Sequence, residues 1–197
     1  VNLKFPDKKY NIIYADPPWD VTRGADFNSN GKSISKYIPK ILNGKSRKLT
    51  YPTMSLNEIK ELPVRDISSN NCKLFIWTIN KYLPDVFDVI KSWGFKYSTT
   101  LLWNKKPMGI GLGGTFTTNT EYLIFAYKGK QNAIKKYDRC WFEQPRGVHS
   151  KKPDFFRNLI SDTYSKDESK IELFARQKYH GWDVWGDEVV VNVNNGI

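Results

Sequence analysis

Residues that bind metals or form disulfides are scarce in this sequence. Its 197 residues include two cysteines, Cys72 and Cys140, and two histidines. Two cysteines without a CxxC spacing, beside so few histidines, argue against a zinc site and against a disulfide framework. We therefore expect no metal site, and we expect the reducing, intracellular setting that is the default for such a chain.

Long apolar runs are also missing. No stretch approaches the roughly 18 apolar residues that a membrane-spanning helix needs. The sequence also shows no signal-peptide pattern. We expect no membrane association and a cytoplasmic location.

Basic residues exceed acidic ones, 31 to 20, which gives a net charge of +11. Such an excess favours a polyanionic partner such as nucleic acid, although many basic proteins bind no polyanion. Hydrophobic content of 40% and charged content of 26% are typical of a globular protein. The length predicts a single domain over residues 1–197, with residues 1–9 as a polar entry arm.

The most informative stretch is residues 10–19. Its short run of β-branched and aromatic residues predicts a buried strand over residues 12–15. The segment Asp16-Pro17-Pro18-Trp19 stops that strand abruptly, because a proline cannot donate to a sheet ladder and fixes its own φ. We expect a stiff loop in which Asp16 points out of the sheet and the Pro17 carbonyl is free to accept. Ligands of open α/β sheets bind at that edge.

An acid, a stiff acceptor loop and an aromatic ring suit the exocyclic amino group of a nucleobase. Asp16 and the Pro17 carbonyl could hold its two N–H bonds, and Trp19 could stack on a base flipped out of its helix. The alternative for the same residues is a strand that ends in a proline turn with a capping aspartate.

Strands and helices alternate along the rest of the chain. Residues 55–62 carry a capping box, and residues 84–93 carry an apolar helical stripe closed by Gly94. This alternation predicts an α/β layered fold. The further strands are expected at residues 73–79, 95–103, 122–127, 141–142, 170–174 and 189–193, and a further helix at residues 154–164, with Pro153 in its first turn.

Several loops have the composition of a nucleic-acid contact. Residues 20–52 predict a long mobile loop that contains Lys45, Arg47 and Lys48, and it is either a solvated surface or a substrate-gripping loop. A second basic region at residues 128–139 is interleaved with aromatics, which suits phosphate contacts and base stacking. The glycines of residues 109–114 are not a nucleotide-binding loop, since no helix pattern follows them.

Two further positions are candidates for ligand contacts. Lys152 precedes the expected helix at its N-terminus, where a cation and exposed N–H groups together favour an anion. Asn119 and Glu121 come just before the strand at residues 122–127, where polar side chains could reach a ligand; a plain turn is the alternative.

In its ordered motifs the chain resembles the MT-A70 family of S-adenosylmethionine-dependent adenine-N6 methyltransferases. The resemblance covers residues 10–188 and follows the family's order. Its segments are Asp16-Pro17-Pro18-Trp19, Tyr51-Pro-Thr-Met-Ser55, Trp103-Asn-Lys105, Asn119-Thr-Glu121, His149-Ser-Lys-Lys-Pro153, Glu172-Leu-Phe-Ala-Arg176 and Gly181-Trp-Asp-Val-Trp-Gly-Asp-Glu188.

The resemblance implies a Rossmann-like class I methyltransferase fold in a permuted order, with the catalytic loop before the cofactor-binding strand. It implies S-adenosylmethionine as cofactor, and it also sorts the site residues into three groups. Those expected to act in catalysis are Asp16, Pro17, Pro18 and Trp19. Those expected around the cofactor are Asp16, Lys152, Phe174, Arg176, Asp187 and Glu188. Those expected to contact substrate are Tyr51, Lys105, Asn119, Glu121, Lys45, Arg47 and Lys48.

Two positions depart from the pattern of related enzymes. Many permuted amino-methyltransferases carry a glycine-rich segment where this chain has Phe174-Ala175-Arg176, and the resemblance implies that Arg176 reaches the ribose instead. Asp187 stands where the family has a ribose-contacting asparagine.

The resemblance implies adenine in nucleic acid as the substrate. DNA is favoured over RNA, because compact members of this kind resemble enzymes of prokaryotes and phages. The expected location is the cytoplasm of a bacterial or phage-infected cell. The alternatives are the same reaction on RNA and a non-catalytic nucleic-acid-binding subunit. A homodimer or a partner subunit is plausible for a chain without a separate recognition domain.

Overall fold

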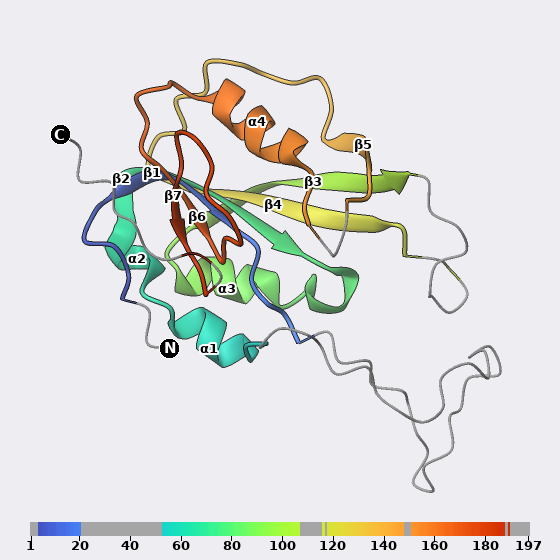
Figure 1. The fold of residues 1–197 in the computed structure, drawn as a ribbon, viewed down its shortest axis with the longest axis horizontal. Helices are drawn as coiled ribbons and strands as arrows, with labels where there is room; N and C mark the ends of the chain where they lie inside the picture. Colours follow the sequence, from blue (N-terminus) through green and yellow to red (C-terminus); the bar gives the residue numbers. More distant parts are fainter. Residues whose placement is uncertain are drawn as a thin grey trace, which may run out of the picture.

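A seven-stranded sheet forms the centre of the molecule in a computed structural model, which describes residues 4–20, 53–106, 116, 118–147, 151–187 and 189 (Figure 1). The strand order is β5-β3-β4-β2-β1-β6-β7. Strand β4 runs antiparallel to both of its neighbours, and every other neighbouring pair is parallel. The strands are β1 Tyr10–Ala15, β2 Ser68–Thr78, β3 Lys96–Lys106, β4 Thr120–Lys128, β5 Trp141–Pro145, β6 Lys170–Leu173 and β7 Asp183–Trp185.

The first strand lies beside a strand from near the end of the chain. Ile13 of β1 is in register with Leu74 of β2 on one side and with Ile171 of β6 on the other. The three strands are parallel, so their carboxyl ends meet at one edge of the sheet. The segments that follow β1, β2 and β6 are therefore brought together, at the edge where open α/β sheets bind ligands.

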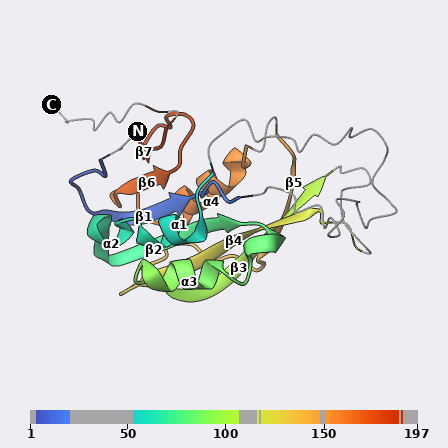
Figure 2. The ribbon, with the colours of Figure 1, turned by 90° about the horizontal axis from the view of Figure 1, so that it is seen from below.

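Helices cover both faces of the sheet. Helices α1 (Leu56–Glu61), α2 (Val64–Ile67) and α3 (Val86–Ser92) lie on one face, and α4 (Asp154–Thr163) lies on the other (Figures 1 and 2). Successive side chains of a strand point to opposite faces of the sheet, so each strand packs against the helices on both faces. Ile13 and Ala15 pack in the cluster under α1 to α3, whereas Ile12 and Tyr14 pack in the cluster under α4. The expected α/β layered fold is confirmed.

Local signals in the sequence account for several element ends. Ser55 and Glu58 form the expected capping box at α1, in which the Ser55 hydroxyl accepts from the Glu58 N–H and the Glu58 carboxylate accepts from the Ser55 N–H. Gly94 follows α3 with φ +82°, a conformation that glycine adopts without strain. Pro153 is the N-cap of α4 and not part of its first turn, one position earlier than expected. The sequence patterns missed α2 and the 3₁₀ turn Asn80–Tyr82.

The entry arm is held against the sheet over its described part. The Phe5 ring lies 4.4 Å from the Trp185 ring of β7, and Lys8 forms an ion pair with Asp183 at 2.8 Å. Apart from Asp20, the loop expected at residues 20–52 lies outside the described residues. So do the glycines of residues 109–114 and, apart from Val189, the strand expected at residues 189–193.

A buried arginine joins α4 to β6. Arg157 is 5% exposed and donates to both carboxylate oxygens of Glu172, at 2.8 and 3.1 Å. It also donates to Asp154 at 2.8 Å, and its guanidinium lies 3.3 Å from the centre of the Tyr179 ring. Burial raises the pKa of Glu172 to about 7, and Arg157 counteracts that rise. Glu172 is therefore only partly charged at neutral pH, and Arg157 is the group that favours its charged form.

We expect the Arg157→Met variant to lose about 3–5 kcal/mol of unfolding free energy, because removing one partner leaves the other charge buried and unpaired. Without Arg157 the pKa of Glu172 rises further above its value in the unfolded chain, so stability falls as pH rises. The loss in urea unfolding should be larger at pH 8 than at pH 6. The control is Arg139→Met, at an exposed position outside this network. Equal unfolding midpoints for wild type and Arg157→Met at both pH values would contradict this role.

Candidate active site

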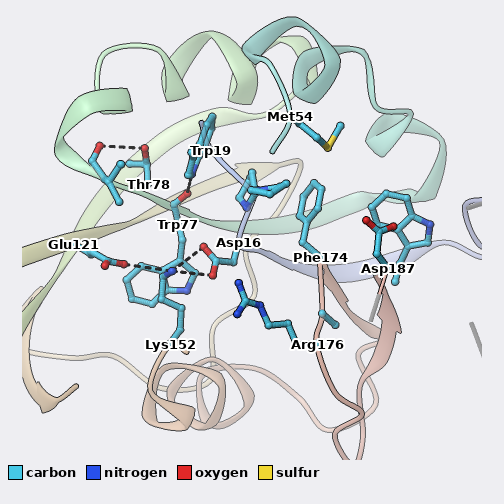
Figure 3. A pocket seen from close by; sticks show the side chains of 16 residues that line it. Asp16, Trp19, Met54, Trp77, Thr78, Glu121, Lys152, Phe174, Arg176 and Asp187 are labelled. Carbon is cyan, nitrogen blue, oxygen red and sulfur yellow. Dashed lines mark hydrogen bonds and ion pairs between the residues drawn. The ribbon is translucent and has the colours of Figure 1, made fainter. Parts of the chain in front are cut away.

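A cavity of about 300 Å³ opens at the carboxyl edge of the sheet (Figure 3). Its walls come from residues 16–19 after β1, residues 77–79 at the end of β2 and residues 174–176 after β6. Residues 185–187, at the end of β7, complete one side. The parallel register of β1, β2 and β6 thus produces a site from segments that lie far apart in the sequence.

Backbone hydrogen bonds fix the loop that follows β1. The Trp19 N–H donates to the Pro17 carbonyl at 2.8 Å, and the Met54 N–H donates to the Pro18 carbonyl at 3.0 Å. The expectation of a free Pro17 carbonyl is therefore wrong, because the tight turn uses it. A carbonyl oxygen has two lone pairs, so it can still accept a second hydrogen bond.

Trp19 anchors this loop from inside the protein. Its side chain is 4% exposed, its Nε1 donates to the Trp77 carbonyl at 2.9 Å, and its ring stacks on the Tyr82 ring with 5.2 Å between centroids. Protein atoms therefore cover one face of the indole. The expected stacking on a flipped base stays a prediction, and the observed packing gives Trp19 a role in holding the acid loop.

Four side chains of alternating charge run from the cavity toward β3. Lys152 Nζ lies 2.8 Å from each carboxylate oxygen of Asp16 and 3.3 Å from Glu121 Oε2. Glu121 in turn accepts from Lys105 at 2.5 Å. Figure 3 shows Lys152 between the two acids, below the Trp77 ring. Each acid thus contacts a cation, and Lys152 contacts both acids.

Burial and these contacts set the protonation of the cluster. Burial raises the pKa of Asp16, and Lys152 opposes that rise. Burial alone would lower the pKa of Lys152, but Asp16 and Glu121 outweigh it and raise that pKa, so the ammonium stays charged. Burial also acts to raise the pKa of Glu121, but Lys152 and Lys105 lower it overall. Asp16 is the acid of this cluster with increased proton affinity.

The opposite wall is a strained turn locked to β7. Phe174 has φ +62°, a conformation that costs a non-glycine residue about 1–2 kcal/mol. The Ala175 N–H donates to the Trp185 carbonyl at 3.0 Å. A Cβ at Gly186 would lie 2.4 Å from the Ala175 carbonyl oxygen, so only glycine fits there. Strained residues of this kind cluster at ligand sites.

The structure brings together most of the predicted site residues that it describes. Lys105 is attached to the cavity through Glu121, whereas Asn119 is exposed, does not line the cavity and accepts the Lys105 N–H with its carbonyl. The predicted residues that line the cavity are Asp16, Pro17, Pro18, Trp19, Glu121, Lys152, Phe174, Arg176 and Asp187. Those outside the described residues are Lys45, Arg47, Lys48, Tyr51 and Glu188.

Lys152 lines the cavity and contacts Asp16 and Glu121. Its expected contact with a cofactor carboxylate stays a prediction. No functional role was predicted for seven other cavity residues. Trp77, Thr78 and Ile79 could have been found as the end of a predicted strand, by the reasoning that identified Asp16. The other four lie in segments that carry the family resemblance: Met54, Ala175, Trp185 and Gly186.

Within the described residues, no three or more histidine, cysteine, aspartate or glutamate side chains are grouped so that they could hold a metal ion. In the same part of the chain, no helix has the length and apolar character needed to cross a membrane.

Comparison with known proteins identifies the family. The MT-A70 family profile matches residues 10–188. The chain is 34% identical to the Type II methyltransferase M.MunI of a Mycoplasma species, over 96% of this chain and 82% of that protein. It is 23% identical to the human N(6)-adenine-specific methyltransferase METTL4, over 93% of this chain and 38% of that protein. It is 24% identical to the N6-methyladenosine RNA methyltransferase MTA1 of Cryphonectria parasitica, over 92% of this chain and 52% of that protein. The family profile and the M.MunI similarity show that this chain belongs to the MT-A70 family of adenine-N6 methyltransferases.

Proposed function

We propose that this enzyme transfers a methyl group from S-adenosylmethionine to N6 of adenine in DNA. In this proposal Asp16 accepts a hydrogen bond from the amino group that is methylated. The observation that carries the proposal is the position of Asp16. Asp16 and the next residue, Pro17, both line the cavity, and Lys152 Nζ lies 2.8 Å from each carboxylate oxygen of Asp16. Two acceptors next to each other suit a group with two N–H donors.

The residues of the cavity fit S-adenosylmethionine, which supplies a methyl group for direct transfer when it is bound. Arg176 and Asp187 line the side of the cavity that includes Phe174 and would serve the ribose (Figure 3). The Phe174 ring offers an apolar surface, and Lys152 offers a positive charge to a carboxylate. Glu188 is proposed for the ribose as well, from the family resemblance alone.

Asp16 would orient the nucleophile and take up its proton. The lone pair of N6 is delocalised into the base, and hydrogen bonds to Asp16 and the Pro17 carbonyl favour a pyramidal, nucleophilic nitrogen. N6 must lose one proton when it gains a methyl group. Burial raises the pKa of Asp16, which makes its carboxylate a better proton acceptor at neutral pH. Correct placement of the reacting groups supplies much of the remaining acceleration.

The proposed fold is a permuted Rossmann-like class I methyltransferase domain formed by the whole chain. Its support is the sheet order, in which β6 comes late in the chain but pairs with β1. The acid loop therefore precedes the proposed cofactor strand in sequence while lying beside it in space.

DNA is the proposed substrate because M.MunI, a type II methyltransferase, is 34% identical to this chain. RNA adenine is the alternative, supported by the weaker similarity to a protein named as an RNA methyltransferase. A non-catalytic subunit is disfavoured, since the Asp16 and Lys152 pair is intact.

Incubation with tritiated S-adenosylmethionine and matched DNA or RNA oligonucleotides, followed by digestion and identification of the labelled nucleoside, tests the reaction directly. We expect label in N6-methyldeoxyadenosine. Label only in the ribonucleoside would assign the enzyme to RNA. The absence of label from both, together with measurable cofactor binding, would contradict catalysis by this chain alone.

Replacement of the proposed proton acceptor should abolish most of the activity. We expect Asp16→Asn to lower kcat by about 10²–10⁴-fold, the usual contribution of a general base. Asp88→Asn, at an exposed aspartate of α3 paired with Lys60 outside the cavity, serves as the control. Thermal unfolding of both variants tests whether the fold is retained. Near-wild-type turnover by a folded Asp16→Asn variant would refute the mechanism.

The two neighbours of Asp16 should shift the pH dependence in opposite directions. Activity requires the Asp16 carboxylate, so it falls as pH drops through the pKa of this group. Glu121 raises that pKa and Lys152 lowers it. The acid limb of kcat should therefore move to lower pH in Glu121→Gln and to higher pH in Lys152→Met. Shifts of both variants in the same direction would show that the acid limb reports another group.

A further inference from the structure

Trp141 is a large aromatic residue on the outer edge of the sheet. It begins β5, which is the edge strand of the sheet, and its side chain is 51% exposed. Its neighbour Phe142 is buried under α4, so the two rings point to opposite faces. A single exposed hydrophobic residue is ordinary on a protein surface, so Trp141 is distinguished by the position that the strand register gives it.

Strand register connects Trp141 to the cavity. Trp141 is opposite Leu102 of β3, Leu102 is opposite Tyr122 of β4, and Tyr122 is opposite Thr78 of β2. Thr78 lines the cavity, and Leu102 and Tyr122 are only partly buried. Residues that are opposite one another in a sheet share a face, so these four side chains form one row. We call this set the edge row.

The length of the edge row matches a short piece of a nucleic-acid strand. Three strand spacings of about 4.8 Å separate the backbones of Thr78 and Trp141, a span of about 14 Å. At about 3.4 Å per stacked nucleotide, that is roughly four nucleotides. A strand with one base in the cavity could therefore bring a neighbouring base to Trp141.

The charge near Trp141 is basic by a small excess. All residues of the segment 132–141 that leads to Trp141 are exposed, and two of its basic residues, Lys135 and Lys136, lie beside the turn that donates to α4 through the Ile134 N–H. The other charges near Trp141 are paired: Arg139 with Asp138, and Lys106 of β3 with Glu143 of β5. Exposed aromatics among basic residues are the usual surface for stacking bases and contacting phosphates.

We propose that Trp141 stacks on a base of the bound nucleic acid, a few nucleotides from the adenine that enters the cavity. This inference rests on the proposed function, because it assigns the flanking strand of the same substrate to the edge row. A second copy of this chain is the other occupant that an edge strand could attract. The net charge of +11 and the continuity of the edge row with the cavity favour the nucleic acid.

Binding of a fluorescein-labelled 20-nucleotide DNA of random sequence, measured by anisotropy, tests the inference. We expect Trp141→Ala to weaken binding about tenfold and Trp141→Phe to retain most of it, because a phenyl ring can still stack. In methylation assays Trp141→Ala should raise KM for DNA and leave kcat at saturation unchanged. The matched control is Tyr97→Ala, an aromatic that is 49% exposed at the other end of β3.

The outcomes distinguish failure of the inference about Trp141 from failure of the proposed function. Unchanged DNA affinity of Trp141→Ala, alongside an active wild type, overturns the inference and leaves the proposed function intact. Unchanged affinity together with a dimer-to-monomer change in sedimentation shows that the edge row joins two copies, which also overturns it. Weakened binding by Trp141→Ala in a chain that methylates neither DNA nor RNA supports the edge row while the proposed function fails.

Discussion

The ion pair between Asp16 and Lys152 is the interaction on which the site depends. Moving two such charges out of water is costly, and a buried pair persists only where geometry and further partners compensate. Glu121 is that further partner for Lys152, and Lys105 plays the same role for Glu121. The result is a cation held by two acids. Lys152 keeps the Asp16 carboxylate in one place and opposes the rise in its pKa that burial causes.

Three elements of the fold must be correctly placed for this cluster to exist. Asp16 follows β1, Glu121 lies near the start of β4, and Lys152 directly precedes the cap of α4. Because β4 runs antiparallel to β2, its first residues lie at the same sheet edge as the carboxyl end of β1. The antiparallel direction of β4 therefore places the Glu121 carboxylate at the sheet edge where β1, β2 and β6 have their carboxyl ends. The Arg157 and Glu172 pair fixes α4, and with it Lys152, against β6.

Local sequence signals predicted much of the fold, because hydrophobic runs, caps and prolines act over a few residues. The strand before Asp16, the capping box at Ser55 and the helix closed by Gly94 are of this kind, and all three are confirmed. The acid loop was found for the same reason, since its two prolines mark where the strand stops.

The contacts within the site could not be predicted in the same way. Lys152 contacts Glu121 and also Asp16, which lies 136 positions earlier in the sequence. These contacts depend on the strand order. The packing of Trp19 on Tyr82 and the close approach of Gly186 to Ala175 likewise depend on which segments become neighbours. Family resemblance supplied many of the residues in these contacts but not their partners, as the position of Lys152 shows.

The protonation of Asp16 is the most direct measure of this arrangement. Carbon-13 NMR of labelled aspartate, with the Asp16 signal assigned by its loss in Asp16→Asn, gives the pKa of this carboxyl in the folded protein. The structure predicts a value above the ordinary pKa of aspartate, about 3.9, and a further rise in Lys152→Met. A pKa at or below the ordinary value, unchanged in Lys152→Met, would show that Asp16 is neither desolvated nor controlled by Lys152 and would contradict its assignment as proton acceptor.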